Sequence, residues 1–369
     1  MWLLLLCLPG AYSPGAALSR RQGARQEAAG RAMSERGRTL EIHTSPHLAS
    51  GASVDDIMRN VVLALLPVAV FAIYSFGLAA ALVLAVAVLS CVATEHLLCR
   101  LVAAPTTLRD WSVTITGLLY GLTLPPALPL WMVAGGGIIG VAMGKFLFGG
   151  LGYNAFNPAL VGRAFLQAAF PVAMTSWSPA FAADRFSQLP ASTLTLPFAA
   201  PVYDGASGAT PLSLFKFDGQ LTATPDLLLG LTNGSAGETC AVLIMAGGLY
   251  LAARRMLNWR IPVAVLASVA LLGWGLHQLA PAEYPPPGFM LCSGGLMLGA
   301  VYMATDMVAS PITNAGCVVY GALIGLLVTV IRLWGGMPEG VMYAILLANA
   351  VSPHIDGLVR PRVFGTRRA

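Results

Sequence analysis

Charged residues are scarce in this sequence. Asp, Glu, Lys and Arg make up 10% of the 369 residues, whereas soluble globular domains carry about 25%. So few charges cannot cover a surface that faces water, which excludes an ordinary soluble domain. Hydrophobic residues make up 57%, and long apolar runs recur between Ile57 and Ser352 with short turns between them. This pattern predicts an all-α polytopic membrane protein.

Closely spaced metal ligands are also missing. The six cysteines include no CxxC pair, so the sequence predicts neither a disulfide framework nor an iron–sulfur site. Cys91 and Cys99 lie eight residues apart on similar faces of one expected helix, but nothing else supports a metal pair there. His43 and His47 have a suitable spacing for haem ligands, yet Pro46 argues against a helix between them. No metal site is expected.

The first 40 residues are not expected to belong to the membrane fold. Met1 opens a short apolar run, but the basic segment that precedes the apolar core of a signal peptide is missing. A signal peptide is one interpretation of this region. The interpretation that we favour is a protein that starts at Met33, with residues 1–40 as an N-terminal extension.

A membrane-spanning helix needs about 20 apolar residues, and ten segments approach that length. The expected spans are 57–76, 79–100, 111–128, 129–149, 159–176, 236–254, 260–279, 288–305, 314–334 and 338–353. Arg163 and Gln167 interrupt the fifth segment, so it is the least regular. Small residues and threonines in the third and eighth segments are compatible with a five-plus-five inverted repeat.

Basic residues concentrate in both tails and in alternate loops. Because cytoplasmic loops of membrane proteins are rich in Lys and Arg, ten spans predict cytoplasmic termini and an extracytoplasmic loop over 177–235. The net charge of +5 then reflects topology, and no nucleic-acid partner is expected. The expected organisation is the extension 1–40, a cytoplasmic arm 41–56, a first membrane bundle 57–176, the long loop 177–235, a second bundle 236–353 and a basic tail 354–369.

The loop 177–235 is too rich in aromatic residues and proline to be a flexible tether. Within it, Asp204-Gly205 and Ser207-Gly208 are turn signals that would present Thr210 on an exposed backbone. Pro211 follows and favours an extended conformation at Thr210. Taken alone, this run indicates a plain turn, because its spacing fits neither a Walker nor a Rossmann loop.

A series of motifs in a fixed order is more specific. The motifs are Ser45-Pro46-His47, Asp110-Trp111-Ser112, Thr116-Gly117-Leu118-Leu119, Leu124-Pro125-Pro126, GYNAFNPA over 152–159, DGASGAT over 204–210, TNGSAGET over 232–239, Ala304-Thr305-Asp306, Ser310-Pro311-Ile312-Thr313 and GGMPEGV over 335–341. With them, nearly everything after Met33 resembles the RnfD family, the D subunits of Rnf-type ion-translocating oxidoreductases. More distantly, it is similar to the B subunits of the sodium-translocating NADH:quinone reductases. One departure is Met307, where the family commonly has proline.

The resemblance implies a flavin on the long loop. In the family, a flavin transferase esterifies the threonine that closes an SGAT-type motif to the phosphate of FMN, and the matching residue is Thr210. Ser207, Gly208 and Ala209 form the recognition run, with Asp204 just before it. The isoalloxazine then carries the redox chemistry, so no catalytic acid or base from the protein is expected. The resemblance also allows a second, non-covalent flavin, although no motif assigns its site.

Ionisable residues in the apolar segments form a second set of candidates. Glu95 with His96, Glu238 and Asp306 lie at or within expected helix ends, where a charge is costly and therefore suggests function. Glu238 and Asp306 adjoin segments interrupted by Gly or Ser-Pro, which favours broken helices that line an ion path. The alternative is that each side chain reaches the membrane surface or caps a helix.

Two basic residues and two glycines surround the GYNAFNPA turn. Lys145 and Arg163 are expected to be ordinary charges at the cytoplasmic edge, with contact to phosphate or lipid as the alternative. Gly140 and Gly144 lie four residues apart and favour close helix packing over a phosphate loop.

The resemblance implies a membrane subunit of an ion-translocating redox complex in the bacterial inner membrane, in which electron transfer through covalent FMN drives Na⁺ or H⁺ transport. The expected partners are the other Rnf complex subunits including a second flavin-bearing subunit, the flavin transferase and the lipid bilayer. Two alternatives stay open: the B subunit of the quinone reductase and, from a different class, a solute permease without a redox cofactor. The short N-terminal arm after Met33 favours the Rnf type.

Overall fold

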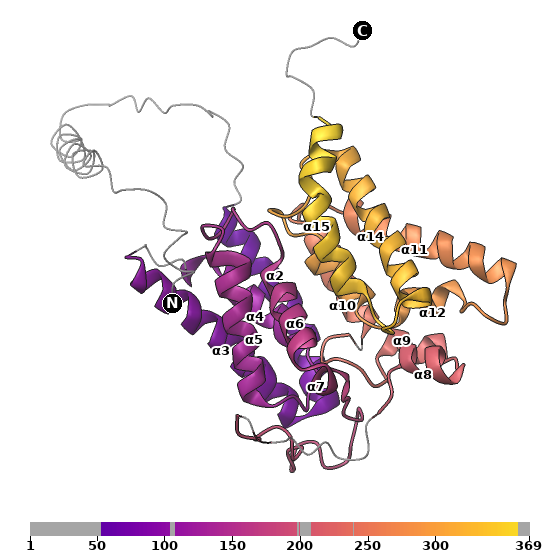
Figure 1. Ribbon diagram of the computed structural model, residues 1–369, viewed down its shortest axis with the longest axis horizontal. Helices are drawn as coiled ribbons and strands as arrows, with labels where there is room; N and C mark the ends of the chain where they lie inside the picture. Colours follow the sequence, from indigo (N-terminus) through magenta and orange to yellow (C-terminus); the bar gives the residue numbers. More distant parts are fainter. Residues whose placement is uncertain (1–52, 104–107, 198, 200–207, 239, 361–369) are drawn as a thin grey trace, which may run out of the picture. The chain divides into compact units, whose positions relative to one another are not determined.

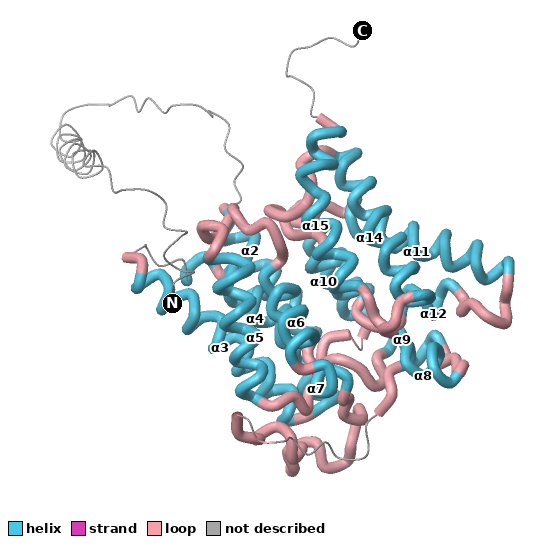
Figure 2. The backbone as a smooth tube through the Cα atoms, viewed as in Figure 1, coloured by secondary structure: helices cyan, strands magenta, loops and turns pink. Residues whose placement is uncertain are grey.

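The computed structural model describes residues 53–103, 108–197, 199, 208–238 and 240–360. Every regular element in these ranges is a helix, and no β-strand occurs among them (Figure 2). The all-α prediction is therefore confirmed for the described residues. Two expected site residues, Asp204 and Ser207, lie outside these ranges, as do the extension 1–40 and residues 361–369 of the tail.

The described helices belong to one compact unit that begins at Val54. Its first half contains α2 (Val54–Phe76), α3 (Leu78–Leu101), η1 (Leu108–Asp110), α4 (Ser112–Leu122), α5 (Leu130–Val141), the π-helix η2 (Ala142–Phe146), α6 (Pro158–Ala169) and α7 (Pro171–Thr175). Helix α3 packs against α4 and α5, and α5 packs against α6 (Figure 1).

The second half begins with two short helices, α8 (Pro211–Asp218) and α9 (Thr224–Leu229). It continues with α10 (Ala241–Ala253), α11 (Arg260–Leu279), α12 (Pro287–Cys292), α13 (Leu296–Leu298), the π-helix η3 (Gly299–Met303), α14 (Asn314–Trp334) and α15 (Val341–Leu358). Helix α14 packs between α11 and α15, while α10 contacts α2 and α15 contacts α6 (Figure 1). The two halves therefore share one packed bundle.

Five of the described helices are long and apolar enough to cross a membrane: α2, α3, α11, α14 and α15. Shorter apolar helices run over Ser112–Leu122, Leu130–Phe146 and Ala241–Ala253. Large apolar side chains also project from the bundle, and Leu249 of α10 and Leu271 of α11 are both 68% exposed. Such a surface is compatible with lipid rather than water. The protein is a multi-pass helical membrane protein.

Two of the expected spans form shorter helices, and two others are divided into pieces. Helix α4 ends at Leu122 rather than at residue 128, because the Pro125-Pro126 pair cannot continue it. Helix α10 starts at Ala241 rather than at residue 236. The expected span 159–176 divides into α6 and α7 before Pro171. The expected span 288–305 divides into α12, α13 and η3 around a non-helical turn at Gly294.

The buried core is continuous through the bundle and includes Val83 of α3, Tyr120 of α4 and Ile324 of α14, none more than 1% exposed. Small residues let neighbouring helices approach closely. A Cβ atom at Gly140 or Gly144 would lie 2.8 or 2.7 Å from backbone atoms of Pro158 at the start of α6. The close packing predicted for these glycines is confirmed.

Candidate functional site

Thr210 occupies the N-cap position of helix α8. Its Oγ1 accepts a hydrogen bond from the Ser213 backbone amide at 3.3 Å and lies 2.9 Å from the Ser213 hydroxyl oxygen. Threonine is a favoured N-cap residue, and Pro211 suits the next position because that position has no amide hydrogen bond to lose. The backbone of Thr210 is extended, as its place before proline predicts. Its hydroxyl therefore lies at a helix N-terminus, which attracts anions.

Small residues immediately precede this hydroxyl. The Gly208 amide donates to the Trp177 carbonyl at 2.9 Å, and a Cβ atom at Gly208 would collide with the side chain of Asn233. Asn233 is itself held in place, because its Oδ1 accepts from the Ala180 amide at 2.8 Å. Close contact therefore requires glycine at position 208, whereas Ala209 is exposed.

Thr210 lines a cavity of about 430 Å³ whose walls come from α6, the Thr210 segment, residues 232–238 and the segment that leads into α15. A volume of this size falls within the range of about 300–1,000 Å³ that small-molecule sites occupy. The side chains that give the cavity its character are aromatic or charged: Trp177, Phe217, Tyr343, Arg163, Glu238 and Glu339. The structure thus brings three predicted site residues, Ala209, Thr210 and Glu238, to one cavity.

Two arginines and two glutamates form a buried charge cluster beside this cavity: Arg163, Glu238, Arg332 and Glu339. Arg163 Nη1 lies 3.1 Å from Glu238 Oε1, and its Nη2 lies 3.3 Å from Glu339 Oε2. Arg332 Nη2 lies 4.0 Å from Glu339 Oε1. Because the formal charges cancel and each carboxylate faces a guanidinium, the cluster can exist inside the protein, where an isolated charge could not.

The turn between α12 and α13 brings backbone groups to the charge cluster. Arg332 donates to the Met290 and Ser293 carbonyls at 2.6 and 2.9 Å, and the Gly295 amide donates to Glu339 Oε1. A Cβ atom at Gly295 would lie 2.7 Å from Glu238 Oε1. The interrupted helix therefore supplies backbone donors and acceptors that a continuous helix would use internally.

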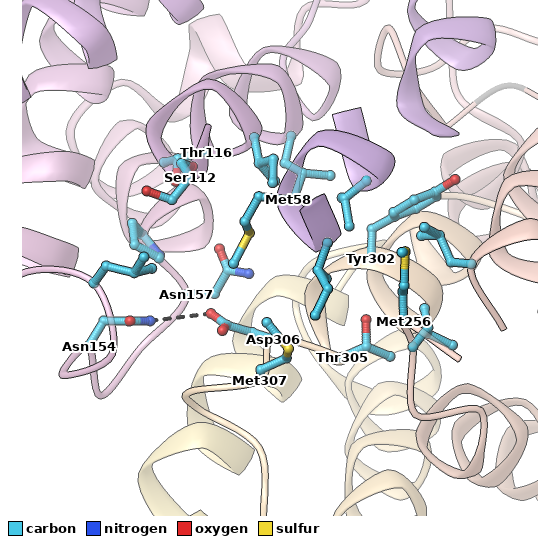
Figure 3. Close-up of a pocket in the computed structure, with 18 of the residues that line it drawn as sticks. Met58, Ser112, Thr116, Asn154, Asn157, Met256, Tyr302, Thr305, Asp306 and Met307 are labelled. Carbon is cyan, nitrogen blue, oxygen red and sulfur yellow. Dashed lines mark hydrogen bonds between the residues drawn. The ribbon is translucent and has the colours of Figure 1, made fainter. Parts of the chain in front are cut away.

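Asp306 lies in a different pocket, of about 110 Å³. Its Oδ2 accepts from Asn154 Nδ2 at 3.2 Å (Figure 3). Its Oδ1 accepts from the Val308 amide at 3.1 Å. Among the residues that the structure describes, Asp306 makes no ion pair. Burial raises the pKa of this carboxyl. Asp306 and Glu238 therefore line separate pockets with different partners.

Polar groups from distant parts of the sequence converge on the Asp306 pocket (Figure 3). They belong to Ser112, Thr116, Lys145, Asn154, Asn157, Tyr302, Thr305 and Asp306. Asn157 holds the two halves together here, since its Oδ1 caps the Ala159 amide at 3.0 Å and its Nδ2 donates to the Met303 carbonyl at 3.3 Å. The flexible apolar part of the lining comes from three methionines, Met58, Met256 and Met307.

The structure corrects the interpretation of Lys145 and Arg163 as charges at the cytoplasmic edge. Lys145 Nζ lies 2.8 and 2.7 Å from the two carboxylate oxygens of Glu95 and 2.8 Å from Ser112 Oγ. The side chains of Lys145 and Glu95 are only 5% and 3% exposed, so Glu95 does not reach the surface either. Arg163 is buried in the charge cluster. The prediction was wrong because the carboxylate partners of both residues come from distant segments.

Sequence reasoning also missed Glu339, Arg332 and Lys216. Glu339 lies in the GGMPEGV motif. The available signal was a glutamate in a break rich in Gly and Pro between two apolar spans. Arg332 lies near the end of the expected span 314–334, yet its side chain is 1% exposed. Lys216 had no signal beyond its place shortly after Thr210.

Comparison with known proteins identifies the family. The sequence matches the NQR2, RnfD, RnfE family over residues 41–365. It is 41% identical to the D subunit of the proton-translocating ferredoxin:NAD(+) oxidoreductase complex of Clostridium ljungdahlii, over 89% of this chain and 96% of that protein. The chain belongs to the NQR2, RnfD, RnfE family. The resemblance seen in the sequence motifs is thereby confirmed.

Two further relatives cover similar lengths. The D subunit of the Na(+)-translocating ferredoxin:NAD(+) oxidoreductase complex of Acetobacterium woodii is 38% identical, over 89% of this chain and 96% of that protein. The D subunit of the ion-translocating oxidoreductase complex of Stutzerimonas stutzeri is 40% identical, over 85% and 93%. Membership of this family extends over both pockets described above.

Proposed function

We propose that this protein is the membrane subunit of an ion-translocating redox complex and carries FMN on Thr210. The observation that carries the proposal is the position of the Thr210 hydroxyl, which caps α8 and lines a cavity of about 430 Å³. The names of the relatives, each the D subunit of an ion-translocating oxidoreductase complex, support this over a solute permease.

The residues around Thr210 fit an esterified flavin nucleotide. The N-terminus of α8 and the Ser213 hydroxyl would accommodate the phosphate, which is favoured at a helix N-terminus. Trp177 and Tyr343 offer aromatic surface for a planar ring. When bound, FMN would supply electron transfer, whereas Arg163 and the aromatic lining would orient it and limit its contact with water. No general acid or base from the protein is required.

We also propose ten membrane crossings, with cytoplasmic termini and Thr210 on the opposite face of the inner membrane. The five long helices and three shorter apolar helices support eight of them. The interrupted segments α6–α7 and α12–η3 would provide the other two, since broken helices are tolerated where they line a cavity. In this topology the flavin transferase and a second flavin-bearing subunit would meet Thr210 on the same face. A five-plus-five repeat stays a prediction.

For the ion path we propose Asp306 and Glu238 as polar positions joined by one face of α6. Asn157 lines the Asp306 pocket, Leu160 lines a small cavity of about 10 Å³, and Arg163 lines the Thr210 cavity. Residues three apart share a helix face, so this face would run from one pocket to the other. One relative is named as proton-translocating and another as Na(+)-translocating. The proposal therefore covers either ion.

We propose the Asp306 pocket as the place for a second, non-covalent flavin. Its hydroxyl and amide groups suit the polar edge of such a ring, and its methionines suit the apolar faces. At about 110 Å³ the pocket lies below the usual range of about 300–1,000 Å³ for a ligand site. The flexible methionine side chains would therefore have to move aside for the ring to fit.

The test of the central proposal is flavin fluorescence on a denaturing gel. The protein is made in cells that contain the flavin transferase, so that covalent attachment can take place. We expect a fluorescent band for the wild type and no fluorescence for Thr210→Ala, because the alanine has no hydroxyl to esterify. Thr232→Ala is the matched control, since Thr232 lines the same cavity outside the SGAT run, and its band should stay fluorescent.

A dark wild-type band in such cells would contradict covalent FMN and would favour the permease alternative. A fluorescent Thr210→Ala band would contradict the choice of residue. Mass spectrometry of the tryptic fragment that contains Thr210 checks the same point independently, because the ester adds the mass of FMN less one water.

A further inference from the structure

Helix α8, which starts at Thr210, has only eight residues. Isolated helices of this length are not stable in water, so contacts with the rest of the protein must hold α8 in place. One set of contacts is apolar. Leu212 packs in a small cluster with Leu227 and Phe289, and the rings of Phe215 and Phe289 lie 5.6 Å apart between centroids.

A second contact comes from a single ammonium group. Lys216, near the end of α8, donates three hydrogen bonds from Nζ: to the carbonyls of Arg332 at 3.0 Å, Gly335 at 2.5 Å and Met337 at 3.0 Å. These bonds use all three donors of the ammonium. The acceptors are carbonyls at the C-terminal end of α14 and in the loop after it, where the helix dipole also favours a cation. Burial lowers the pKa of this amine.

The loop that Lys216 holds is also a wall of the Thr210 cavity. Met337 and Glu339 of this loop line the cavity. Glu339 also pairs with Arg163, whose Nη2 lies 3.3 Å from Glu339 Oε2. Lys216 therefore joins the helix that begins at Thr210 to a cavity wall that is otherwise fixed through the charge cluster. The apolar contacts of α8 lead elsewhere, to Leu227 of α9 and Phe289 of α12.

We propose that Lys216 is a positioning residue, which fixes the Thr210 helix against the 335–340 loop and so sets where a group attached to Thr210 lies in the cavity. This inference rests on the proposed attachment of FMN to Thr210. Attachment itself needs only the hydroxyl and its recognition run. Loss of Lys216 should therefore leave the flavin attached but less well held.

The experiment compares Lys216→Gln and Lys216→Met with Lys216→Arg, in the full chain assembled with its complex. Asp218→Asn is the matched control, because Asp218 lies exposed on the same helix and makes none of these contacts. Two properties are measured on the flavin-bearing protein: quenching of flavin fluorescence by iodide, and the reduction potential of the covalent flavin. Hydrogen exchange over 212–218 is measured as well, with or without flavin.

We expect wild-type fluorescence on the gel for every variant. For Lys216→Gln and Lys216→Met we expect stronger iodide quenching and a shifted flavin potential. Hydrogen exchange over 212–218 should be faster by about tenfold, because hydrogen bonds from a charged group are lost. Lys216→Arg should restore only part of the wild-type behaviour, because it keeps the charge but its planar guanidinium cannot direct three donors from one atom to the same carbonyls. The quenching and the potential are measured only on flavin-bearing molecules, which keeps protein without flavin out of the comparison. If one neutral variant fails to accumulate in the membrane, the other is enough for the test.

The outcomes separate the two proposals. A dark wild-type band would overturn the flavin attachment. A fluorescent wild type with wild-type quenching and potential in both neutral variants would overturn the role of Lys216 and leave the attachment intact. A dark band in Lys216→Gln beside a fluorescent Asp218→Asn would also overturn it, because Lys216 would then be needed for attachment rather than for position.

Discussion

The two polar pockets of this protein handle buried charge in different ways. In the Thr210 cavity, Arg163 bridges Glu238 and Glu339 at 3.1 and 3.3 Å, so every carboxylate faces a guanidinium. In the Asp306 pocket, the carboxyl has an amide side chain and a backbone amide as its hydrogen-bond partners. The first arrangement places charges of opposite sign against each other, whereas the second holds one acid that makes no ion pair among the described residues.

This difference indicates a division of labour. A buried ion pair is costly to break, because removal of one partner leaves the other charge uncompensated. Such a cluster suits a region that must hold a bound group in a constant position. A single acid whose pKa is raised can take up or release a cation at lower cost. That property suits the exchange of an ion at Asp306, whereas Glu238, inside the cluster, would be a fixed polar position on the proposed ion path. The comparison can be tested with one measurement, thermal stability of the purified protein in detergent.

The largest effect is expected for Arg163→Met. The variant removes the guanidinium that pairs with both Glu238 and Glu339 and leaves two carboxylates close together, one of them buried. We expect a loss of about 3–5 kcal/mol in the free energy of unfolding, as for other broken buried pairs. The readout is the unfolding temperature, together with the amount of folded protein recovered from membranes.

Arg59→Met provides the control for that experiment. Arg59 also pairs with a carboxylate, Asp56, at 3.1 Å, but the two side chains are 60% and 45% exposed. An exposed pair contributes about 1 kcal/mol or less, so this variant should resemble the wild type. Equal losses for Arg163→Met and Arg59→Met would show that the charge cluster does not hold the Thr210 cavity together.

A smaller effect is expected for Gly295→Ala. The added methyl would lie 2.7 Å from Glu238 Oε1 and 3.0 Å from Glu339 Oε1, so the carboxylates would have to move away from the turn. We expect a loss of about 1–3 kcal/mol, typical of overpacking, measured again as a fall in unfolding temperature.

Gly275→Ala is the matched control for this glycine. Gly275 lies inside α11, and a Cβ atom there would meet no other atom within 4 Å. Alanine is the better helix former, so this change should stabilise by about 0.5–1 kcal/mol. If Gly295→Ala is as harmless as Gly275→Ala, then the carboxylates of the cluster are mobile, and the contrast with the Asp306 pocket becomes weaker.

The sequence predicted much of the fold because hydrophobic runs and prolines act locally. The five long helices lie within a few residues of the expected spans, as for the expected 79–100 and the observed Leu78–Leu101. The extended backbone at Thr210 and the packing of Gly140 and Gly144 also follow from neighbouring residues. The breaks at Gly294 and Pro171 were harder to predict, because an apolar segment has a similar composition whether or not its helix is continuous.

The candidate site was only partly predictable, because its contacts join residues far apart in the chain. The sequence singled out Thr210, Glu238 and Asp306 one by one. Nothing in it revealed that Arg163 would meet Glu238 across 75 positions and Glu339 across 176. A charged residue in an apolar segment looks the same in sequence whether it reaches the surface or finds a buried partner, and only the packing of the helices distinguishes the two.

The smallest effect on stability is expected for Asp306→Asn, and its sign tests the comparison most directly. The folded-state pKa of Asp306 is raised, so its ionisation opposes folding. This penalty appears as the pH rises above the pKa of the unfolded state and is complete above the pKa of the folded state. The asparagine avoids it, so the variant should be slightly more stable than the wild type at neutral pH, by about 1 kcal/mol or less. The difference should vanish in acid, where the wild-type carboxyl is protonated.

The same variant should abolish redox-driven ion transport in vesicles if Asp306 belongs to the ion path, because asparagine cannot change its charge. Retained flavin fluorescence on the gel would show that the protein is otherwise intact. If Asp306→Asn were instead less stable than the wild type at neutral pH, the ionised carboxylate would be stabilised by its surroundings, as in the charge cluster. The two pockets would then treat charge alike, and the Asp306 pocket would be a second fixed site rather than a place of exchange.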